Sequence, residues 1–427
     1  MSSICPTSDT TVVVVGQGFV GLAIAMRAVD VGYRVIGFEH NDARVAQLVA
    51  GHSYVGDIDS ARLRAALGTG RYVPTSLTSN LEGFAVAIVT VPTPLSNGVP
   101  DLSFIEQAVR QIAPYLSRDA TVVLESTTYP GTTEELVAPL LESGSGLTVG
   151  TDFHLGYSPE RIDPGNDTWN FQNTPKVVSG INESSALAVQ RFYDTIVDRT
   201  VLVENCRVAE LSKLLENTFR HVNIALVNEL AMFANALDVD VWAAIEAAAT
   251  KPFGFMEFTP GPGVGGHCLP VDPSYLSWKV EQLAGIPFQF IDLANDVNDQ
   301  MPQYVVRRSI AILNESGRAI RGSHILILGL AYKKNSTDAR EAPGPIVCSL
   351  MEKMGAVVRV VDPLVDGSDI PSNFQRVELS EDELARADLT VVITDHDQFD
   401  WELIAHASTR ILDTRHRLDS AANVEFL

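Results

Sequence analysis

The sequence is poor in cysteine and has no long apolar run, and these absences limit the class of protein. Its 427 residues include four cysteines, far apart in the chain and without a C-x-x-C pair. This spacing suggests neither a zinc site nor a disulfide framework, so we expect no bound metal and a reducing, cytoplasmic setting. The chain starts without a signal-peptide pattern and has no apolar stretch long enough to span a membrane, so we expect no membrane partner.

Positive charge is also scarce. The chain has 31 Lys and Arg residues against 53 Asp and Glu residues, which gives a net charge of −22. Nucleic acid would be repelled overall, so we expect no nucleic-acid partner. A local basic pocket for a small phosphate ligand is compatible with this charge. The length is enough for two or three domains.

The N-terminal stretch has the pattern of a dinucleotide-binding unit. The β-branched run Thr11–Val15 predicts a buried parallel strand, and a helical stretch, Leu22–Val29, follows it. Between them lies a G-x-G-x-x-G turn formed by Gly16, Gly18 and Gly21. Such a turn lets a pyrophosphate approach the helix N-terminus, although a packing turn in another α/β domain has the same glycines. A second strand, Arg34–Phe38, ends in Glu39, whose carboxylate suits ribose hydroxyls and repels a 2′-phosphate, so the predicted cofactor is NAD rather than NADP.

Strand-like runs and helical stretches alternate as far as Ser179. The runs are 84–91, 120–124, 152–156 and 176–179, and the helical stretches between them include 102–116 and 133–141. This alternation predicts a doubly wound parallel sheet, in which ligands bind beyond the carboxyl ends of the strands. The polar residues expected at those ends are Thr93, Ser126, Thr127, Glu160 and Arg161.

A long helix is predicted over Val208–Leu237, where the chain has neither proline nor glycine and apolar residues recur at helical spacing. At 1.5 Å per residue it would be roughly 45 Å long, joining two domains and offering a dimer surface. Lys213 and Asn217 are four residues apart and therefore share a face of this helix. Asn223 and Asn228 lie in the same apolar helix and need polar partners, of which substrate is one candidate.

The stretch Thr259–Pro273 reads TPGPGVGGHCLPVDP, and its mixture of glycine and proline predicts a loop of special backbone geometry. The loop carries one thiol, Cys268, next to His267 and four residues before Asp272. A thiolate attacks carbonyl carbon readily, so Cys268 is a candidate nucleophile. A buried structural cysteine in a glycine turn is the alternative.

A second α/β pattern begins at Ser323–Leu328 and continues through the strand-like runs 357–361, 389–394 and 410–412. The predicted fold class is α/β, with two Rossmann-like doubly wound domains joined by a long central helix. The expected domains are an N-terminal NAD-binding domain (1–205), a central helical domain with the Cys268 loop (206–318) and a C-terminal Rossmann-like domain (319–427).

Seven motifs, in this order, resemble those of the nucleotide-sugar 6-dehydrogenases, the family that includes UDP-glucose dehydrogenase. They are GQGFVGL, VPTP, ESTTYPGTT, YSPERIDPGN, the helix with Lys213 and Asn217, GPGVGGHCLPVDP and GLAYKKNSTDARE. The resemblance covers nearly the whole chain. It implies an NAD-dependent enzyme that oxidises a sugar CH₂OH to a carboxylate in two steps. In the second step, Cys268 would add to the aldehyde as a thiohemiacetal, whose oxidation gives a thioester that water hydrolyses.

The resemblance also implies roles for individual residues. The catalytic set is Cys268 as nucleophile, Lys213 with Asn217 at developing oxyanions, Asp272 in proton transfer, and Glu160 and Thr127 at the reaction water or substrate. The NAD set is Gly16, Gly18, Phe19, Val20, Gly21, Glu39, Arg44, Thr93 and Thr127. The set at the UDP-sugar is Glu160, Arg161, Lys213, Asn217, Gly265, His267, Tyr332, Lys334 and Arg415, and residues 261–266 should pass against the substrate.

Three positions depart from the UDP-glucose dehydrogenase pattern. His267, Val271 and Pro164 stand where that enzyme usually has a small residue, a lysine and an acid. GHCLPVDP and PERIDPGN resemble the branch that oxidises UDP-N-acetylhexosamines, and PSYLSWK favours UDP-N-acetylglucosamine. UDP-N-acetylmannosamine and UDP-glucose remain alternatives, as do a two-electron hydroxyacid-type dehydrogenase and an NAD-binding protein without activity. The family also implies at least a homodimer around the long helix.

Overall fold

The computed structural model describes residues 10–56, 58–96, 98–162, 166, 168–266, 269–365 and 374–427. Three residues singled out in the sequence, Pro164, His267 and Cys268, lie outside these ranges. The chain forms two compact units. The first unit comprises Met1–Glu216 and Ser274–Lys279, and the second comprises Asn217–Pro273 and Val280–Leu427. The three domain boundaries expected from the sequence stay a prediction.

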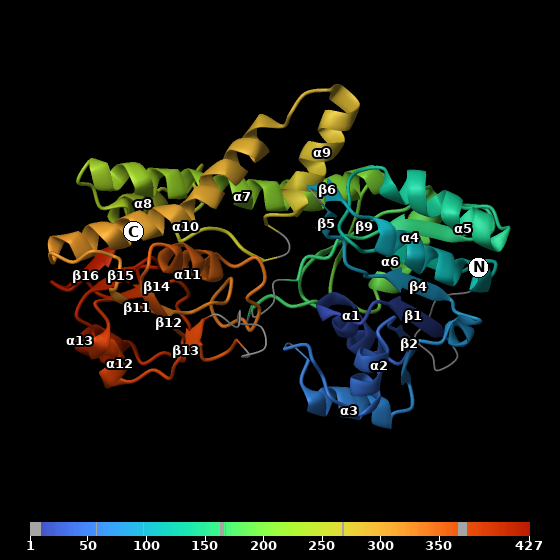
Figure 1. Ribbon diagram of the computed structural model, residues 1–427. Coiled ribbons are helices and arrows are strands. Elements are labelled where there is room, and N and C mark those ends of the chain that lie inside the picture. The colour runs from blue at the N-terminus through green and yellow to red at the C-terminus, as the bar shows by residue number, and fades with distance from the viewer. Residues whose placement is uncertain are drawn as a thin grey trace. The chain divides into compact units, whose positions relative to one another are not determined.

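The first unit is built on a six-stranded sheet in the order β3-β2-β1-β4-β7-β8. Figure 1 labels β1, β2 and β4 of this sheet. Every pairing in this sheet is parallel. The strands are β1 (Thr11–Val15), β2 (Arg34–Phe38), β3 (Tyr72–Thr75), β4 (Val86–Val89), β7 (Thr121–Leu124) and β8 (His154–Tyr157). The first strand lies at the centre and the chain crosses to its other side after β3, which is the order of the doubly wound dinucleotide-binding fold. The predicted fold class is confirmed for this unit.

Two apolar cores lie on the two faces of this sheet, because successive side chains of a strand point to opposite faces. Val12 packs in the core formed with α1, α3 and α6, and Val13 packs in the core formed with α4 and α5. Burial on both faces explains why β1 is an unbroken run of valine after its first residue. The helices are α1 (Phe19–Asp30), α2 (Asp42–Val49), α3 (Ser60–Gly68), α4 (Ser103–Ile112), α5 (Ala138–Ser145) and α6 (Glu183–Tyr193).

Two stretches of this unit differ from the sequence prediction. The helix expected at 133–141 begins as a π-helical turn, Thr133–Val137, before α5. The run at 176–179 forms β9 (Lys176–Val178), which pairs with β10 (Thr200–Leu202) in a separate two-stranded parallel sheet. The residues that follow β9 still contact the main sheet, because the backbone N–H groups of residues 179 and 181 donate to the carbonyl oxygens of Tyr157 and Leu155 in β8. Minor elements are η1 (Thr78–Leu81), η2 (Ala113–Tyr115) and the hairpin of β5 (Leu95–Ser96) and β6 (Val99–Pro100).

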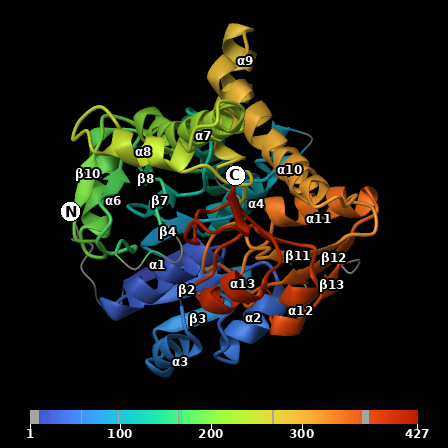
Figure 2. The same cartoon turned by 90° about the vertical axis from the view of Figure 1, so that its left-hand side faces the viewer.

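Helix α7 (Cys206–Ala236) continues without a break for 31 residues, which confirms the single long helix predicted. Its residues up to Glu216 belong to the first unit and the others belong to the second. In the second unit, α8 (Val241–Ala249) packs against α7 in an apolar cluster that includes Val227, Ala231 and Trp242 (Figure 2). The helix α9 (Asp272–Ala284) follows the glycine loop.

The second unit repeats the architecture of the first. Its six-stranded parallel sheet has the order β13-β12-β11-β14-β15-β16. Helices α10 and α11 cover one face, and α12 and α13 cover the other (Figure 1). The elements are α10 (Gln289–Glu315), β11 (His324–Leu328), α11 (Pro343–Lys353), β12 (Val357–Val361), β13 (Gln375–Arg376), α12 (Glu381–Arg386), β14 (Leu389–Val392), α13 (Trp401–Ala407), β15 (Ile411–Asp413) and β16 (Val424–Phe426). This sheet confirms the second Rossmann-like domain. Among the described residues, no helix is both long and apolar enough to cross a membrane.

Candidate active site

The glycine turn after β1 has two glycines that the fold requires and one that faces open space. Gly16 has a φ of +89°, in the left-handed region, and a Cβ on it would lie 2.9 Å from the carbonyl oxygen of Thr90. A Cβ on Gly21 would lie 1.8 Å from the carbonyl oxygen of Gly16, so the first turn of α1 packs directly on the loop. A Cβ on Gly18 would meet no described atom within 4 Å. The N-terminus of α1 is therefore open to a ligand at Gly18.

The carboxylate of Glu39 is anchored beside this turn. Its Oε2 accepts the N–H of Gln17 at 3.1 Å, and its Oε1 accepts the N–H of Asn41 at 3.0 Å. The residue is only 7% exposed. A helix N-terminus attracts a pyrophosphate, and a carboxylate at the end of the next strand can accept hydrogen bonds from ribose hydroxyls. The residues present thus fit the two ends of an adenosine diphosphate group, as NAD requires.

The other residues expected near NAD lie either just after a strand or in the first turn of a helix. Phe19 and Arg44 are exposed, in α1 and at the start of α2, and the Arg44 guanidinium lies 5.4 Å from the centre of the Tyr54 ring. Thr93 and Thr127 are half-buried and follow β4 and β7. Val20, in the first turn of α1, is also half-buried. Their contact with NAD stays a prediction.

Sequence reasoning missed Gln17, which is fully buried between the first two glycines. Its Nε2 donates to the carbonyl oxygen of Val14 at 2.8 Å, and its Oε1 accepts the Tyr72 hydroxyl at 2.7 Å. Burial raises the pKa of Tyr72 well above its ordinary value, so the hydroxyl stays a donor. Gln17 ties the turn to β3, and its place at a variable position of the glycine motif gave no signal of this role.

Lys213 and Glu160, predicted as catalytic residues, meet in the first unit. The Lys213 Nζ donates to the backbone carbonyl oxygen of Glu160 at 2.7 Å, and Lys213 is only 9% exposed. Glu160 lies just after β8, at the carboxyl edge of the sheet where ligands of this fold bind. Helix α7 thus presents its lysine to the end of β8.

The neighbouring Arg161 is already paired. Its guanidinium contacts the Glu216 carboxylate at 2.8 Å and 3.2 Å and donates to the carbonyl oxygen of Pro175 at 2.8 Å. These contacts hold Arg161 toward α7. A role at the substrate would require it to exchange partners, and it stays a prediction.

A buried lysine, Lys176, was not singled out in the sequence. Its Nζ lies 3.0 Å from Oε2 of Glu125 and 2.8 Å from Oε2 of Glu160. Tyr193 donates a short hydrogen bond to the other oxygen of Glu125. These groups link the ends of β7 and β8 at Glu160, the residue that also contacts Lys213. No local sequence pattern predicts them, because the partners are distant in the chain.

Asn217 and Asp272, two further predicted catalytic residues, are brought together in the second unit. The Asn217 Nδ2 donates to Oδ2 of Asp272 at 2.5 Å, and the two residues are 7% and 3% exposed. The contact joins α7 to the first turn of α9, directly after the loop that carries Cys268. The position of Cys268 itself lies outside the described residues, as does that of His267.

The glycines before Cys268 allow close packing inside the second unit. A Cβ on Gly261 would lie 2.7 Å from Nη1 of Arg415, and one on Gly265 would lie 3.0 Å from Cβ of Tyr332. The loop therefore touches two residues predicted to bind substrate. The Arg415 Nε donates to a backbone carbonyl at 2.8 Å, and burial lowers the pKa of this guanidinium. Lys334 pairs instead with Asp397 at 2.7 Å near the surface.

A buried amide network holds the start of this loop. Asn228 Oδ1 accepts the N–H of Gly261 at 2.9 Å, and its Nδ2 donates to Oδ1 of Asn298 at 2.9 Å. The partners of Asn228 are thus protein groups. Asn223, also considered for substrate, donates to the backbone of Phe219 one turn earlier.

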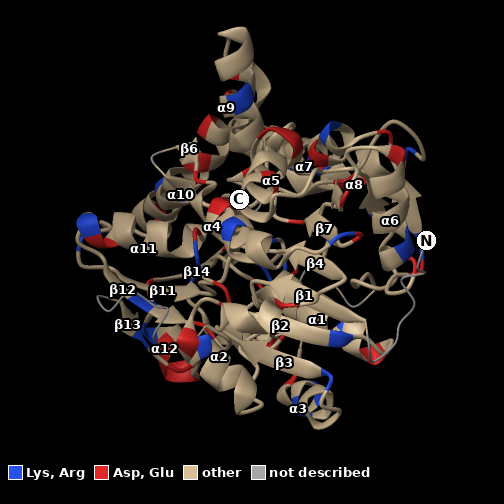
Figure 3. Ribbon diagram, turned by 90° about the vertical axis from the view of Figure 1, so that its right-hand side faces the viewer, with Lys and Arg blue, Asp and Glu red and all other residues tan. Residues whose placement is uncertain are grey.

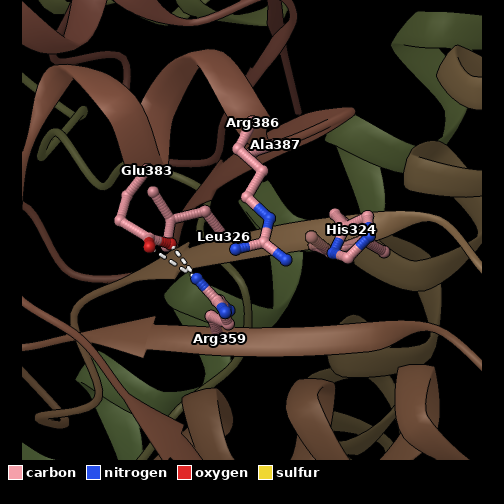
Figure 4. A pocket seen from close by; sticks show the side chains of 7 residues that line it. His324, Leu326, Arg359, Glu383, Arg386 and Ala387 are labelled. Atoms are coloured by element: carbon pink, nitrogen blue, oxygen red, sulfur yellow. Dashed lines mark hydrogen bonds and ion pairs between the residues drawn. The ribbon is translucent and has the colours of Figure 1, made fainter.

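The second unit also has an acidic helix turn, a narrow crevice and a larger cavity. The first turn of α12 carries Glu381, Asp382 and Glu383 (Figure 3). The crevice at the Arg359–Glu383 ion pair (Figure 4) has a volume of about 10 Å³, at the lower limit for one water molecule. A larger cavity of about 300 Å³ lies in the second unit beside the glycine loop, lined by Gly263, Val264, Asn298, Asp299, Pro302, Pro343 and Ile346.

Comparison with known proteins matches the whole architecture. The chain matches three models of the UDP-glucose/GDP-mannose dehydrogenase family: the NAD binding domain at residues 10–197, the central domain at 207–300 and the UDP binding domain at 326–420. It is 35% identical over 412 residues to a UDP-N-acetyl-D-mannosamine dehydrogenase of Pyrococcus horikoshii, covering 95% of both chains. It is 35% identical over 394 residues to a UDP-N-acetyl-D-glucosamine 6-dehydrogenase of Salmonella typhi, covering 92% of this chain and 91% of the relative. The solved structure of UDP-D-ManNAc dehydrogenase from Pyrococcus horikoshii aligns with a TM-score of 0.88 at 34% identity, covering 98% of each chain.

The two Rossmann domains and the open glycine turn define an NAD-dependent dehydrogenase. The chain belongs to the UDP-glucose/GDP-mannose dehydrogenase family, the nucleotide-sugar 6-dehydrogenases. It is therefore an enzyme with NAD as cofactor and a UDP-binding domain for its sugar nucleotide. The family resemblance drawn from the seven motifs is confirmed.

Proposed function

We propose that the enzyme oxidises the C6 hydroxyl of a UDP-N-acetylhexosamine, with UDP-N-acetylglucosamine favoured, to the corresponding uronic acid. The observation that carries this proposal is the match of more than nine-tenths of the chain to relatives named for UDP-N-acetylhexosamines. The GHCLPVDP and PERIDPGN motifs support the same substrate class. UDP-N-acetylmannosamine is the second candidate, because the relatives named for the two sugars are equally similar to this chain.

The residues that would hold NAD are the glycines of the first turn, with Gly18 open at the helix N-terminus, and Glu39 at the ribose. When bound, NAD accepts a hydride in each of the two oxidations. The chain's own task is to remove protons, to stabilise the oxygen that becomes negative and to keep the aldehyde bound between the steps.

The alcohol must first lose its hydroxyl proton. Lys213 and Asp272 are the candidates to take it, directly or through water, and the Lys213 ammonium can then stabilise an oxyanion. Asn217 donates to Asp272 and so fixes the direction of that carboxylate. For the second oxidation, a nucleophile must first add to the aldehyde, because only a tetrahedral carbon that carries an alkoxide or hydroxyl oxygen can lose a hydride.

We propose Cys268 as this nucleophile. Its thiolate sulfur bonds to the aldehyde carbon, and the carbonyl oxygen takes a proton, which gives a thiohemiacetal. The carbon then loses its hydrogen as a hydride and the hydroxyl loses its hydrogen as a proton, which gives a thioester. Water then adds to the thioester carbon, the carbon–sulfur bond breaks, and the carboxylate and the thiol are released. Overall, one alcohol, two NAD⁺ and one water give one carboxylate, two NADH and three protons.

The substrate contacts that we propose lie in the second unit. Arg415 and Tyr332 line the glycine loop at Gly261 and Gly265, so they can meet the same ligand as that loop. Lys334 would have to leave Asp397 to reach a phosphate. Contacts of His267 follow only from the family motif.

The test is an NADH-production assay with a panel of UDP-, GDP- and TDP-sugars. We expect the highest kcat/KM with UDP-N-acetylglucosamine, and two NADH for each sugar consumed. One NADH per sugar would instead favour a two-electron dehydrogenase. For Cys268→Ser we expect intact folding and NAD binding but no acid product. Full acid formation by this variant would refute the thioester route.

We also propose that two copies associate through α7. Apolar side chains that are each more than 40% exposed recur along it at intervals of three, four or seven residues: Val208, Leu211, Leu215, Phe219, Leu226, Leu230 and Phe233. A second copy of the same stripe would cover this surface, and a symmetric pair is the commonest assembly. Sedimentation should give a dimer or larger species for the wild type and a monomer for Leu226→Lys combined with Leu230→Lys. A wild-type monomer at micromolar concentration would refute the proposal.

A further inference from the structure

The structure contains a buried ammonium for which the proposed reaction has no use. Lys176 is 3% exposed and lies between the carboxylates of Glu125 and Glu160, at 3.0 Å and 2.8 Å. The rings of Phe171 and Tyr193 flank it, with their centres 5.3 Å and 5.4 Å from Nζ. Burying a charge is costly unless it is paired, and here two anions and two aromatic faces surround it.

The contacts continue from Lys176 to Lys213 through one residue. Glu160 uses Oε2 for Lys176 and Oε1 for the N–H groups of Arg161 and Ile162, at 2.6 Å and 2.5 Å. Oε1 therefore holds the Glu160 side chain against the following backbone, and Oε2 ties it to Lys176. The backbone carbonyl oxygen of the same residue accepts the Lys213 Nζ at 2.7 Å. The direction of that carbonyl thus depends on a side chain that Lys176 holds.

The charges in this cluster also depend on Lys176. Burial opposes the ionisation of Glu160, but Lys176, Lys213 and the backbone N–H of Ile162 together lower the pKa of Glu160. Glu125 lies on the other side of the ammonium, and burial raises its pKa to about 7. Removing Lys176 would leave two buried carboxylates facing one another, which would take up a proton or move apart.

We propose that Lys176, supported by Glu125, is a positioning residue that holds Glu160 in the conformation that orients Lys213. The inference rests on the proposed function only in assigning Lys213 to catalysis. It also gives Glu160 a different task from the one expected from the family: its carbonyl orients the lysine, and its carboxylate anchors the turn.

The test compares Lys176→Met, which removes the charge at similar length, with Lys176→Arg, which keeps it. A displacement of about 1 Å in a catalytic group can cost roughly 100-fold in rate. We expect Lys176→Met to lower kcat about 100-fold while the KM for NAD stays within twofold, and Lys176→Arg to recover at least tenfold of the loss. The control is Arg118→Met, which removes a surface cation of the same unit that pairs with Asp152. We expect it to retain wild-type kcat.

A double-variant cycle separates positioning from general destabilisation. If Lys176 acts through Lys213, the Lys176→Met change should cost less than threefold in a Lys213→Met background. A full 100-fold cost in that background, or wild-type kcat in Lys176→Met alone, would overturn the inference. Wild-type kcat in Lys213→Met would overturn both the inference and the catalytic role proposed for Lys213. Should Lys176→Met not fold, Glu125→Gln combined with Lys176→Met removes one buried carboxylate together with the ammonium and carries the same expectations.

Discussion

Replacing Asn228 by alanine should destabilise the second unit by breaking a hydrogen-bond chain with a fixed direction. Gly261 can only donate from its N–H, so the Asn228 oxygen faces it and the Asn228 amide nitrogen faces Asn298. The Asn298 nitrogen then faces Nδ1 of His221 at 3.4 Å, and Nε2 of His221 donates to Asn295 at 2.8 Å. A neutral His221 fits this order, and burial lowers the pKa of His221.

The magnitude follows from the two groups left behind. In Asn228→Ala, the N–H of Gly261 and the Oδ1 of Asn298 both lose their partner in the interior, where Asn228 is fully buried. Each unsatisfied buried group costs about 1–3 kcal/mol, so the loss should be about 2–6 kcal/mol. For a unit of about 200 residues, about 3 kcal/mol lowers Tm by roughly 6–12 °C.

The assay is thermal and urea unfolding of the full chain, with Asn223→Ala as control. Asn223 lies on the same helix and donates to the backbone oxygen of Phe219 at 2.7 Å, so its loss leaves an acceptor that water can reach. We expect this control to stay within about 0.5 kcal/mol of the wild type. Equal unfolding curves for the two variants would refute the reasoning, because they would mean that water or a shifted side chain satisfies Gly261 and Asn298.

Three further outcomes follow from single groups. Gly21→Ala should destabilise the first unit and abolish NAD binding, because its Cβ would overlap the Gly16 carbonyl. Gly18→Ala should keep Tm within about 2 °C and weaken only NAD binding, which titration calorimetry would measure. Glu39→Ser should raise the ratio of kcat/KM for NADP to that for NAD at least tenfold, and an unchanged ratio would contradict its place at the ribose. Burial opposes the ionisation of Asp362, but hydrogen bonds from His396 and backbone N–H groups lower its pKa to about 2. This lowered pKa contributes about 2 kcal/mol to the stability above pH 4, and the contribution is lost as the pH falls toward 2. The stability of Asp362→Asn should therefore fall less steeply than that of the wild type in acid unfolding between pH 4 and pH 2.

The fold could be predicted where local pattern and burial agree. The valine run, the glycine turn and the acid at the end of β2 all lie within Thr11–Glu39. Each of them indicates the same dinucleotide-binding unit. The helices α2 and α3 were not predicted, because both are mostly exposed. Helix α2 buries only Leu48, and α3 buries only Leu63 and Ala66. Helices without a clear apolar face have no strong periodic signal.

The candidate site could be predicted in its residue types but not in its pairings. Residues at strand ends are found by counting strands, and this located Glu160 and Thr127. The partner of a buried charge is set by which segments the fold brings together. Lys176 is 51 residues from Glu125 and 16 from Glu160, so no sequence window contains the cluster.

The pairings also separate residues that can turn to a ligand from those that are held in place. Glu160 faces the buried Lys176, and breaking a buried ion pair costs several kcal/mol. The Arg161–Glu216 pair is 29% and 41% exposed and is exchanged at smaller cost. Lys213 faces a neutral carbonyl, and in the described part of the chain its ammonium forms no ion pair. A neutral hydrogen bond is exchanged at smaller cost, and an ammonium is stabilised by an oxygen that becomes negative during the reaction. These contacts support the proposal that Lys213, on α7, rather than Glu160 meets the reacting oxygen.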